Sequence, residues 1–258
     1  MVRASIIGCG NMGSALVRGL AATGEHTITA CDADPEALEP VAAHADRTTT
    51  SLETAADADV IFLVVKPDHV GEVLSDLDLE NGQTLVSFAA AVSTDYIEAR
   101  TDATVERVMP NLAAENGNVA AAIASPVEDD TVRTMLSDLG TVVEVDESHM
   151  DLATAVNGSG PAFVFYFIQA MKRAAMDGGM SDTAAESLVA QTFKGAAETV
   201  LESDRSVDEL IDAVCSPNGT TIEGMRVLRD SDVEEVIAET IAVTEDRAEE
   251  IRSEVSHG

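Results

Sequence analysis

The sequence predicts an α/β protein: a doubly wound, mostly parallel sheet followed by an all-helical domain. Strand-like apolar runs alternate with helical stretches up to about Asp146, a pattern typical of βαβ units. A glycine-rich turn follows the first of these runs. Beyond Asp146 the strand-like runs stop and long helical stretches dominate. We therefore expect a Rossmann-type domain over residues 1–147 and a helical domain over residues 148–258.

The first half contains eight short runs that predict strands. They are Ala4–Ile7, His26–Ala30, Arg47–Thr49, Val60–Val65, Thr84–Phe88, Thr104–Val108, Val119–Ile123 and Thr141–Val145. Helices are predicted at Asn11–Ala22, at Pro35–Ala43 and near Glu128–Leu139. The fourth run is nearly all apolar, as expected for a strand buried on both faces.

The second half predicts five helices. They are Pro161–Asp177, Asp182–Leu201, Val207–Ala213, Thr220–Leu228 and Val233–Ile251. The first has very few charges before Lys172, and a helix that is apolar all round must be buried. A helical half of this size cannot cover it completely, so we expect a partner subunit to do so in a homodimer or a higher homo-oligomer.

Acidic residues outnumber basic ones by 47 to 15, which gives a formal net charge of −32. Such a charge argues against binding nucleic acid or an anionic membrane surface. The acids are dispersed, lysine occurs only at Lys66, Lys172 and Lys194, and aromatic residues make up 3%. This composition predicts a halophilic protein, because molar salt shortens the Debye length to about 3 Å and screens the self-repulsion.

The cysteines and the apolar runs predict a cytoplasmic location. Cys9, Cys31 and Cys215 form no CxxC pair, which suits a reducing compartment and gives no sign of a metal site. No apolar run approaches the length of a membrane span. The N-terminus runs directly into a predicted strand, so no signal peptide is expected.

Gly8, Gly10 and Gly13 form G-C-G-N-M-G between the first predicted strand and the first predicted helix. In that context the motif is typical of dinucleotide binding. The first glycine permits a tight turn, the second lets the backbone approach the pyrophosphate, and the third allows close packing of helix on strand. A plain tight turn is the alternative.

Asp32 ends the second predicted strand, where an acid binds the ribose 2′-hydroxyl of NAD(H). Asp34 follows, and no arginine occurs from there until Arg47, so the local chemistry favours NADH over NADPH. A solvated acid in a very acidic protein remains an alternative.

Two further loops are expected at the carboxyl edge of the sheet, where ligands bind in open α/β folds. Lys66-Pro67 ends the buried fourth run, which places Lys66 toward the cofactor. Ala89 and Ala90 follow the next strand, and their small size would let the nicotinamide lie close. Ordinary loop chemistry is the alternative for both.

Residues 215–224 read CSPNGTTIEG, a turn that leads straight into a helix. The N–H groups at such a helix start and the helix dipole can hold an anion such as a carboxylate. Ser216, Thr220 and Thr221 add hydroxyl groups. The alternative is an ordinary helix start capped by Ser216 or Asn218.

These motifs, in this order, resemble one family along essentially the whole chain. GCGNMGSAL, VKP, RVMPN, NGSGPAF and CSPNGTTIEGMRVL are similar to segments of pyrroline-5-carboxylate reductase. The resemblance implies a Rossmann domain followed by a helical dimerisation domain. It also implies NAD(P)H-dependent reduction of the cyclic imine pyrroline-5-carboxylate to proline, commonly with NADPH, so the preference between the two cofactors stays open.

The resemblance also implies roles for individual residues. Those holding the cofactor pyrophosphate would be Gly8, Cys9, Gly10, Asn11, Met12 and Gly13. Those at the nicotinamide end would be Val65, Lys66, Pro67, Ala89 and Ala90, with Asn111 on the adjoining rim. The substrate would contact Ser216, Gly219, Thr220 and Thr221, with its carboxylate on the N–H groups of the last three and its ring nitrogen at the Thr221 hydroxyl.

The chain departs from the family pattern at several places. Leu112-Ala113 stands where Thr-Pro is usual, and Asn157 where serine is frequent. Ala91 replaces a common glycine, and Asn218-Gly219 a frequent Gly-Gly. Met225 and Arg229 are also less typical. None of these changes removes a hydroxyl or an N–H donor from the predicted substrate turn.

The expected chemistry asks little of side chains, because an iminium carbon accepts hydride readily once substrate and cofactor are aligned. This agrees with five isolated histidines and no acid–base pair, and it leaves Thr221 as the candidate catalytic residue. The alternatives are another imine reductase and a β-hydroxyacid dehydrogenase, whose family needs a lysine early in the helical domain. A redox-sensing dinucleotide-binding protein is the non-enzymatic alternative.

Overall fold

The computed structural model describes residues 1–111, 119–127 and 129–257. The chain forms two compact units. The sheet unit contains Met1–Ser159 and Ile241–Gly258, and the helical unit contains Gly160–Thr240. The functional division at residues 147 and 148 stays a prediction.

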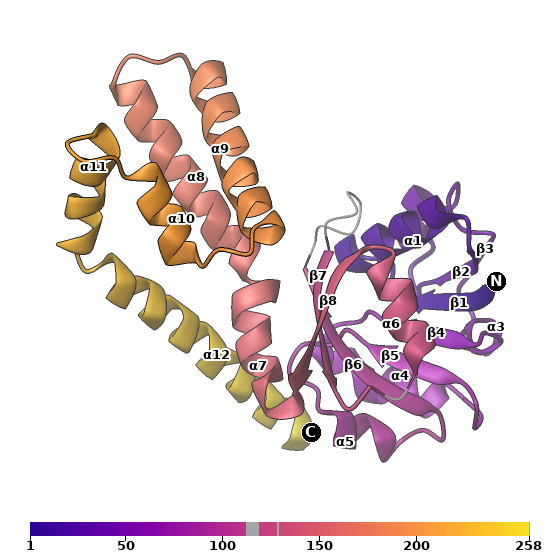
Figure 1. Ribbon diagram of the computed structural model, residues 1–258. Coiled ribbons are helices and arrows are strands. Elements are labelled where there is room, and N and C mark those ends of the chain that lie inside the picture. The colour runs from indigo at the N-terminus through magenta and orange to yellow at the C-terminus, as the bar shows by residue number, and fades with distance from the viewer. Residues whose placement is uncertain (112–118, 128, 258) are drawn as a thin grey trace. The chain divides into compact units, whose positions relative to one another are not determined.

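Within the described residues the sheet unit holds one eight-stranded sheet in the order β3-β2-β1-β4-β5-β6-β7-β8 (Figure 1). The strands are β1 (Val2–Ile7), β2 (His26–Cys31), β3 (Arg47–Thr49), β4 (Val60–Leu63), β5 (Thr84–Ser87), β6 (Thr104–Pro110), β7 (Val119–Ser125) and β8 (Gly140–Asp146). All neighbours pair in parallel except β6 and β7, which are antiparallel. The predicted doubly wound, mostly parallel sheet is confirmed.

The helical segments between Asn11 and Gly158 are short, apart from α1. They are α1 (Asn11–Thr23), α2 (Pro35–Leu38) with a 3-10 turn (Glu39–Val41), α3 (Leu52–Ala56), a 3-10 turn (Pro67–His69), α4 (Val70–Asp76), α5 (Thr94–Glu98), α6 (Asp130–Ser137), a 3-10 turn (Glu147–His149), α7 (Met150–Ala153) and a π-helical turn (Thr154–Gly158). The helix predicted near Glu128–Leu139 is thus α6, and residue 128 lies outside the described residues. The short helices α3, α4 and α5 were not predicted, because fewer than about two turns carry no clear 3.6-residue period.

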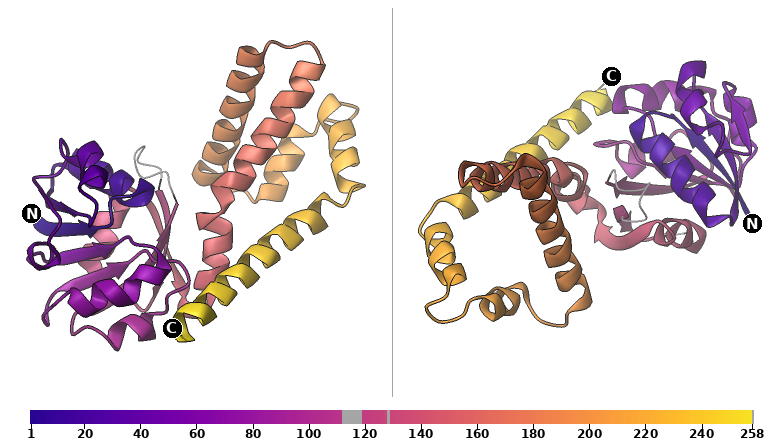
Figure 2. Two further views of the ribbon diagram at one scale, coloured as in Figure 1. Left: turned by 180° about the vertical axis from the view of Figure 1, so that it is seen from behind. Right: turned by 90° about the horizontal axis from the view of Figure 1, so that it is seen from above.

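Helices cover both faces of the sheet, as Figures 1 and 2 show. One core cluster joins Ile6 and Phe62 to side chains of α1, α2 and α6, including Leu16. A second cluster joins Ile7 and Leu63 to side chains of α3, α4 and α5. Successive strand residues point to opposite faces, so the unbroken apolar runs supply both clusters.

A buried ion-pair network ties the C-terminal end of α12 (Val233–His257) to the sheet unit. Arg107 on β6 is 1% exposed, and its guanidinium lies 2.8 Å from a Glu147 carboxylate oxygen and 3.3 Å from Asp151. Arg252 on α12 contacts the other oxygen of Asp151 at 2.7 Å. Helix α12 therefore belongs to both units: its residues up to Thr240 are part of the helical unit, and those from Ile241 are part of the sheet unit.

The helical unit consists of α8 (Gly160–Asp177), α9 (Asp182–Glu202), α10 (Val207–Val214), α11 (Thr220–Arg229) and the first part of α12. Helices α8 and α9 pack side by side (Figure 2). The single chain leaves α8 without a buried residue, and Phe165 and Tyr166 are 67% and 69% exposed. No helix in the described residues is long and apolar enough to cross a membrane.

Candidate functional site

The glycine turn between β1 and α1 is packed too tightly for side chains at two of its three glycines. Gly8 has a φ of +97°, and a Cβ there would lie 2.4 Å from the Val64 carbonyl oxygen. A Cβ on Gly13 would lie 1.8 Å from the Gly8 carbonyl oxygen. A Cβ on Gly10, in contrast, would meet no atom within 4 Å. The turn therefore presents an open backbone surface at Gly10.

Helix α1 begins at this open surface. Gly10 is its N-cap without a side-chain hydrogen bond, and the first helical bond runs from the Ser14 N–H to the Gly10 carbonyl at 2.9 Å. A helix start leaves the preceding N–H groups, here those of Asn11, Met12 and Gly13, without intrahelical partners. With the positive end of the helix dipole, this surface suits an anion such as a pyrophosphate. The open cradle therefore fits a dinucleotide.

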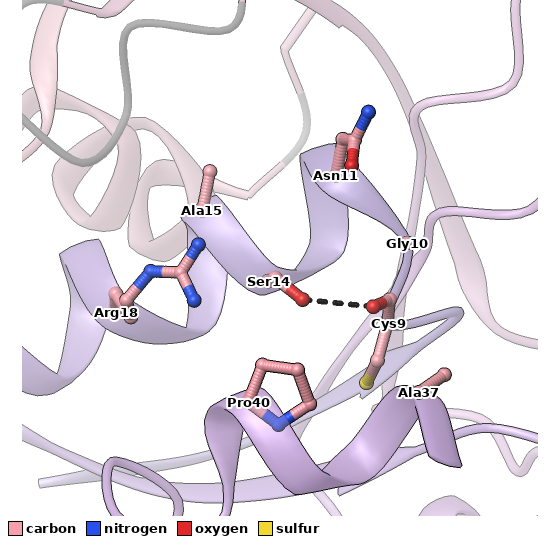
Figure 3. A pocket seen from close by; sticks show the side chains of 8 residues that line it. All are labelled: Cys9, Gly10, Asn11, Ser14, Ala15, Arg18, Ala37 and Pro40. Atoms are coloured by element: carbon pink, nitrogen blue, oxygen red, sulfur yellow. Dashed lines mark hydrogen bonds between the residues drawn. The ribbon is translucent and has the colours of Figure 1, made fainter.

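A pocket of about 560 Å³ opens beside the turn (Figure 3). Its lining comes from the turn, from α1 and from the segment after β2: Cys9, Gly10, Asn11, Ser14, Ala15, Arg18, Ala37 and Pro40. The buried Ser14 hydroxyl donates to the Cys9 carbonyl at 2.8 Å, which fixes the shape of the turn (Figure 3). Sequence reasoning missed Ser14, because a serine one position after the last glycine gives no signal of its own.

Asp32, directly after β2, holds the glycine turn from the other side. One carboxylate oxygen accepts the Cys9 N–H at 2.6 Å, and the other accepts the Asp34 N–H at 2.9 Å. Asp32 is thus a half-buried, fixed acceptor at the edge of the turn rather than a freely solvated acid. This contact supports the predicted position of the acid, while its role toward a ribose stays a prediction.

The thiols of Cys9 and Cys31, beside the turn, are unreactive. Burial, followed by the nearby Asp32 charge, raises the pKa of Cys9 to about 12 and that of Cys31 to about 11. Both thiols therefore stay protonated at neutral pH and supply no nucleophile. Cys9 contributes to the candidate site through its backbone N–H and its place in the pocket wall.

The loops after β4 and β5 lie at the same carboxyl edge, because these strands are parallel neighbours of β1 and of each other. Val65 lies next to the turn, with its Cγ1 3.1 Å from where a Gly8 Cβ would be. Strand β4 ends at Leu63, earlier than predicted, although the Val64 N–H still donates to the Ile7 carbonyl of β1 at 2.8 Å. Exposed Lys66 caps the 3-10 turn that Pro67 begins.

The loop after β5 contains backbone strain. Ala89 is buried and Ala90 half-buried, and Ala91 follows with a φ of +62°. An alanine in this left-handed region costs about 1–2 kcal/mol relative to a glycine. Ala91, which replaces a glycine common in the family, therefore keeps the backbone conformation that suits glycine.

Asn111 continues the same edge after β6. Its N–H donates to the Ala120 carbonyl at 3.0 Å, and its side-chain oxygen accepts the Ala120 N–H at 3.3 Å. Asn157 donates to the carbonyls of Met109 and Ala120, both at 2.7 Å. The asparagine that replaces a frequent serine thus ties the π-helical turn to two strands. Leu112-Ala113 lies outside the described residues.

The predicted substrate turn lies in the helical unit, before α11. Asn218 has a φ of +60°, and the Gly219 N–H donates to the Ser216 carbonyl at 2.9 Å. A Cβ on Gly219 would lie 2.3 Å from the Ser216 Oγ. The N-cap of α11 is Gly219, with no side-chain hydrogen bond. The alternative of a cap by Ser216 or Asn218 is therefore wrong.

The turn leaves polar groups open to a ligand. The first-turn N–H groups of Thr220 and Thr221 have no intrahelical partners, and the side chains of Ser216, Thr220 and Thr221 are exposed. The Gly219 N–H, the third predicted donor, is used by the turn itself in this conformation. Their contact with substrate stays a prediction.

The doubly wound sheet, its glycine turn and the helical unit are typical of an oxidoreductase with a Rossmann-type dinucleotide-binding domain and a helical domain. Residues 3–91 match the family model described as NADP oxidoreductase coenzyme F420-dependent. Residues 147–251 match the model described as pyrroline-5-carboxylate reductase dimerisation.

Full-length relatives identify the family. The pyrroline-5-carboxylate reductase of Methanosarcina acetivorans is 36% identical, over 95% of this chain and 96% of its own. The Coxiella burnetii pyrroline-5-carboxylate reductase structure gives a TM-score of 0.86 at 29% identity, covering 97% of this chain and 98% of its own. The Plasmodium falciparum pyrroline carboxylate reductase with NADP bound gives 0.84 at 25% identity, with the same coverage. The chain belongs to the pyrroline-5-carboxylate reductase family.

The hydroxyacid dehydrogenase alternative shares the fold alone. The Mycobacterium tuberculosis 3-hydroxyisobutyrate dehydrogenase is 17% identical over 70% of this chain and 67% of its own, with a TM-score of 0.51.

Proposed function

We propose that this protein is a pyrroline-5-carboxylate reductase that uses NADH or NADPH to convert L-1-pyrroline-5-carboxylate to L-proline. One observation carries the proposal: this chain contains both a glycine turn with an open backbone at Gly10 and a turn before α11 whose N-cap makes no side-chain hydrogen bond. The first suits a dinucleotide and the second a small carboxylate. The product gives the protein a role in amino-acid biosynthesis. We assign it to the cytoplasm, because its three cysteines are free thiols, as suits a reducing compartment.

The cofactor half of the proposal rests on the sheet unit. Pyrophosphate binding is assigned to Gly8, Cys9, Gly10, Asn11, Met12 and Gly13. The nicotinamide end is assigned to Val65, Lys66, Pro67, Ala89 and Ala90, with Asn111 on the rim. When bound, the dinucleotide supplies the hydride. The support for these roles is the shared carboxyl edge of β1, β4, β5 and β6.

The substrate half rests on the turn before α11. Ser216, Gly219, Thr220 and Thr221 are assigned to the substrate, whose carboxylate accepts the open N–H groups of Thr220 and Thr221. The Thr221 hydroxyl is assigned to the ring nitrogen. As the C=N carbon gains hydride, the nitrogen gains a proton, either from solvent before the transfer or from this hydroxyl, which then recovers its proton from solvent. No separate acid–base pair is needed, because the imine protonates readily.

Lys172 bears on the hydroxyacid dehydrogenase alternative, which needs a lysine as its acid–base group. Its ammonium contacts Glu186 at 2.5 Å and Asp182 at 3.0 Å. These bonds raise the pKa of Lys172, whereas an acid–base lysine needs a lowered one. Lys172 therefore serves the pairing of α8 with α9, which favours the imine reductase.

The exposed apolar side chains of α8 support assembly into a homodimer or a higher homo-oligomer. Phe165, Tyr166 and Met171 are each about half exposed or more in the single chain. Exposed apolar side chains around a helix that carries very few charges indicate a protein interface. We assign it to a second copy of the chain, with no nucleic acid or membrane partner.

The decisive experiment is oxidation of NADH and of NADPH by the purified protein with pyrroline-5-carboxylate in molar KCl. We expect proline to form in proportion to the oxidised cofactor. The six-membered cyclic imine and 3-hydroxyisobutyrate (with oxidised cofactor) serve as competing substrates. Turnover of the hydroxyacid alone would contradict the proposal, and cofactor binding without any turnover would favour the redox sensor.

A further inference from the structure

We propose that Asp32 makes this protein select NADH over NADPH, with Asp34 adding to the selection. The inference rests on the proposed function and concerns only the adenosine end of the dinucleotide. Asp32 is a specificity-determining residue here, distinct from the groups assigned to the reacting atoms.

The Asp32 carboxylate is fixed in place before any ligand binds. Each of its oxygens accepts one backbone N–H, from Cys9 at 2.6 Å and from Asp34 at 2.9 Å. An ionised carboxylate oxygen can accept more than one hydrogen bond. Both oxygens therefore keep acceptor capacity for the two neighbouring hydroxyls of an adenosine ribose that follows a pyrophosphate on Gly10.

The 2′-phosphate of NADPH would be unfavourable next to the Asp32 carboxylate. It has no hydroxyl donor for Asp32 and brings two negative charges toward a fixed negative one. A second carboxylate, that of Asp34, is held on the same segment. The Asp34 side chain caps α2 by accepting the Glu36 N–H at 2.9 Å. Glu36, in the first turn of that helix, adds a third. Repulsion at this edge therefore opposes NADPH.

We assign neither of the two basic residues on the neighbouring elements, Arg47 and Arg18, to a 2′-phosphate. The pairing of β2 with β3 puts Thr49 level with Cys31 at the edge, and Arg47 level with Thr29. Arg47 thus starts about 7 Å back along the strand. Arg18 lines the pocket (Figure 3), but it is not a free cation. It lies seven residues after Asn11, about 10 Å along the helix axis.

The test measures equilibrium binding rather than turnover. Dissociation constants of NADH and NADPH are determined by fluorescence with the full-length protein, without substrate. The pair ADP-ribose and 2′-phospho-ADP-ribose isolates the adenosine end. We expect the ligand without the 2′-phosphate to bind at least about tenfold more tightly in both pairs.

Variants assign the selection to named residues. Asp32→Asn should lower the NADH:NADPH affinity ratio at least about tenfold. Asp34→Asn keeps a side chain that caps helices well and should lower the ratio by a smaller factor. Glu39→Gln is the matched control, because it removes the same charge from an exposed position in the following 3-10 turn. Its ratio should equal that of the wild type.

Three results would overturn the inference. The first is wild-type binding of NADPH as tight as that of NADH. The second is an Arg18→Gln variant that loses NADPH binding selectively, because Arg18 would then hold the 2′-phosphate. The third is an equal change of the NADH:NADPH affinity ratio in Asp34→Asn and Glu39→Gln. This comparison tests the inference even if Asp32→Asn does not fold. Tight NADPH binding with intact imine reduction would leave the proposed function standing, whereas binding of neither cofactor would remove both.

Discussion

Thr221 is the single side chain on which the proposed chemistry most directly depends. The residue is exposed at the start of α11. Contrary to the prediction from the sequence, the histidines are not all isolated: among the described residues His26 lies 3.9 Å from Asp138, and His69 lies 4.0 Å from Glu72. Both pairs belong to the sheet unit and not to the helical unit of Thr221. A hydroxyl that donates to the ring nitrogen stabilises the developing amine, while the backbone N–H groups hold the carboxylate. The hydroxyl can therefore be removed without touching the anion site.

Thr221→Ala should lower kcat about a hundredfold, the usual effect of losing one transition-state donor. Cofactor affinity should not change, because the change lies in the helical unit. Thr221→Ser should recover most of the turnover, since serine keeps the hydroxyl. Steady-state kinetics together with cofactor titration check this, and wild-type turnover in the alanine variant would remove Thr221 from the mechanism.

At the scale of elements, the strand–turn–helix around the glycines separates packing from ligand contact. Gly13→Ala puts a Cβ against the Gly8 carbonyl and should destabilise the sheet unit by about 3 kcal/mol or more. Gly10→Ala meets only open space and should leave stability within about 0.5 kcal/mol. It should still weaken dinucleotide binding on the order of tenfold, because the methyl group occupies the pyrophosphate approach.

Chemical denaturation and cofactor titration of both variants check this contrast. Equal stability losses would show that Gly10 also serves packing. Unchanged cofactor affinity in a folded Gly10→Ala variant would place the pyrophosphate elsewhere.

The threonine turn allows a similar comparison within one helix. Gly219→Ala clashes with Ser216 and should raise the KM for pyrroline-5-carboxylate by deforming the turn. Gly224→Ala, further along α11, meets no atom within 4 Å. It should stabilise the protein by about 0.5–1 kcal/mol through helix propensity. Kinetics and thermal unfolding check both, and an equal rise of KM in the two variants would argue against a local role of the turn.

At the scale of the whole molecule, charge dominates. Most of the basic side chains in the described residues pair with acids, among them Arg3, Arg133, Lys194, Arg226 and Arg247. The formal net charge is nevertheless −32, so a large excess of acids has no cationic partner. Exposed pairs contribute about 0–1 kcal/mol each, which does not balance repulsion of this extent.

We therefore propose a halophilic protein and expect its Tm to rise steeply between millimolar and molar KCl. The Debye length falls from about 30 Å at 0.01 M to about 3 Å at 1 M, so added salt screens the repulsion. Scanning calorimetry over this range checks the prediction, with light scattering to follow subunit dissociation. A Tm that does not change would contradict the adaptation.

The sequence by itself determined the order of strands and long helices, the glycine turn and the turn before α11. These depend on features that neighbouring residues carry, such as apolar period and glycine content. Only the tertiary structure decided how the site is held together. The contacts of Asp32 with Cys9 and of Asn157 with Met109 and Ala120 join residues far apart in the chain. Such contacts depend on which strands pair in the sheet, and no local pattern in a single sequence indicates them.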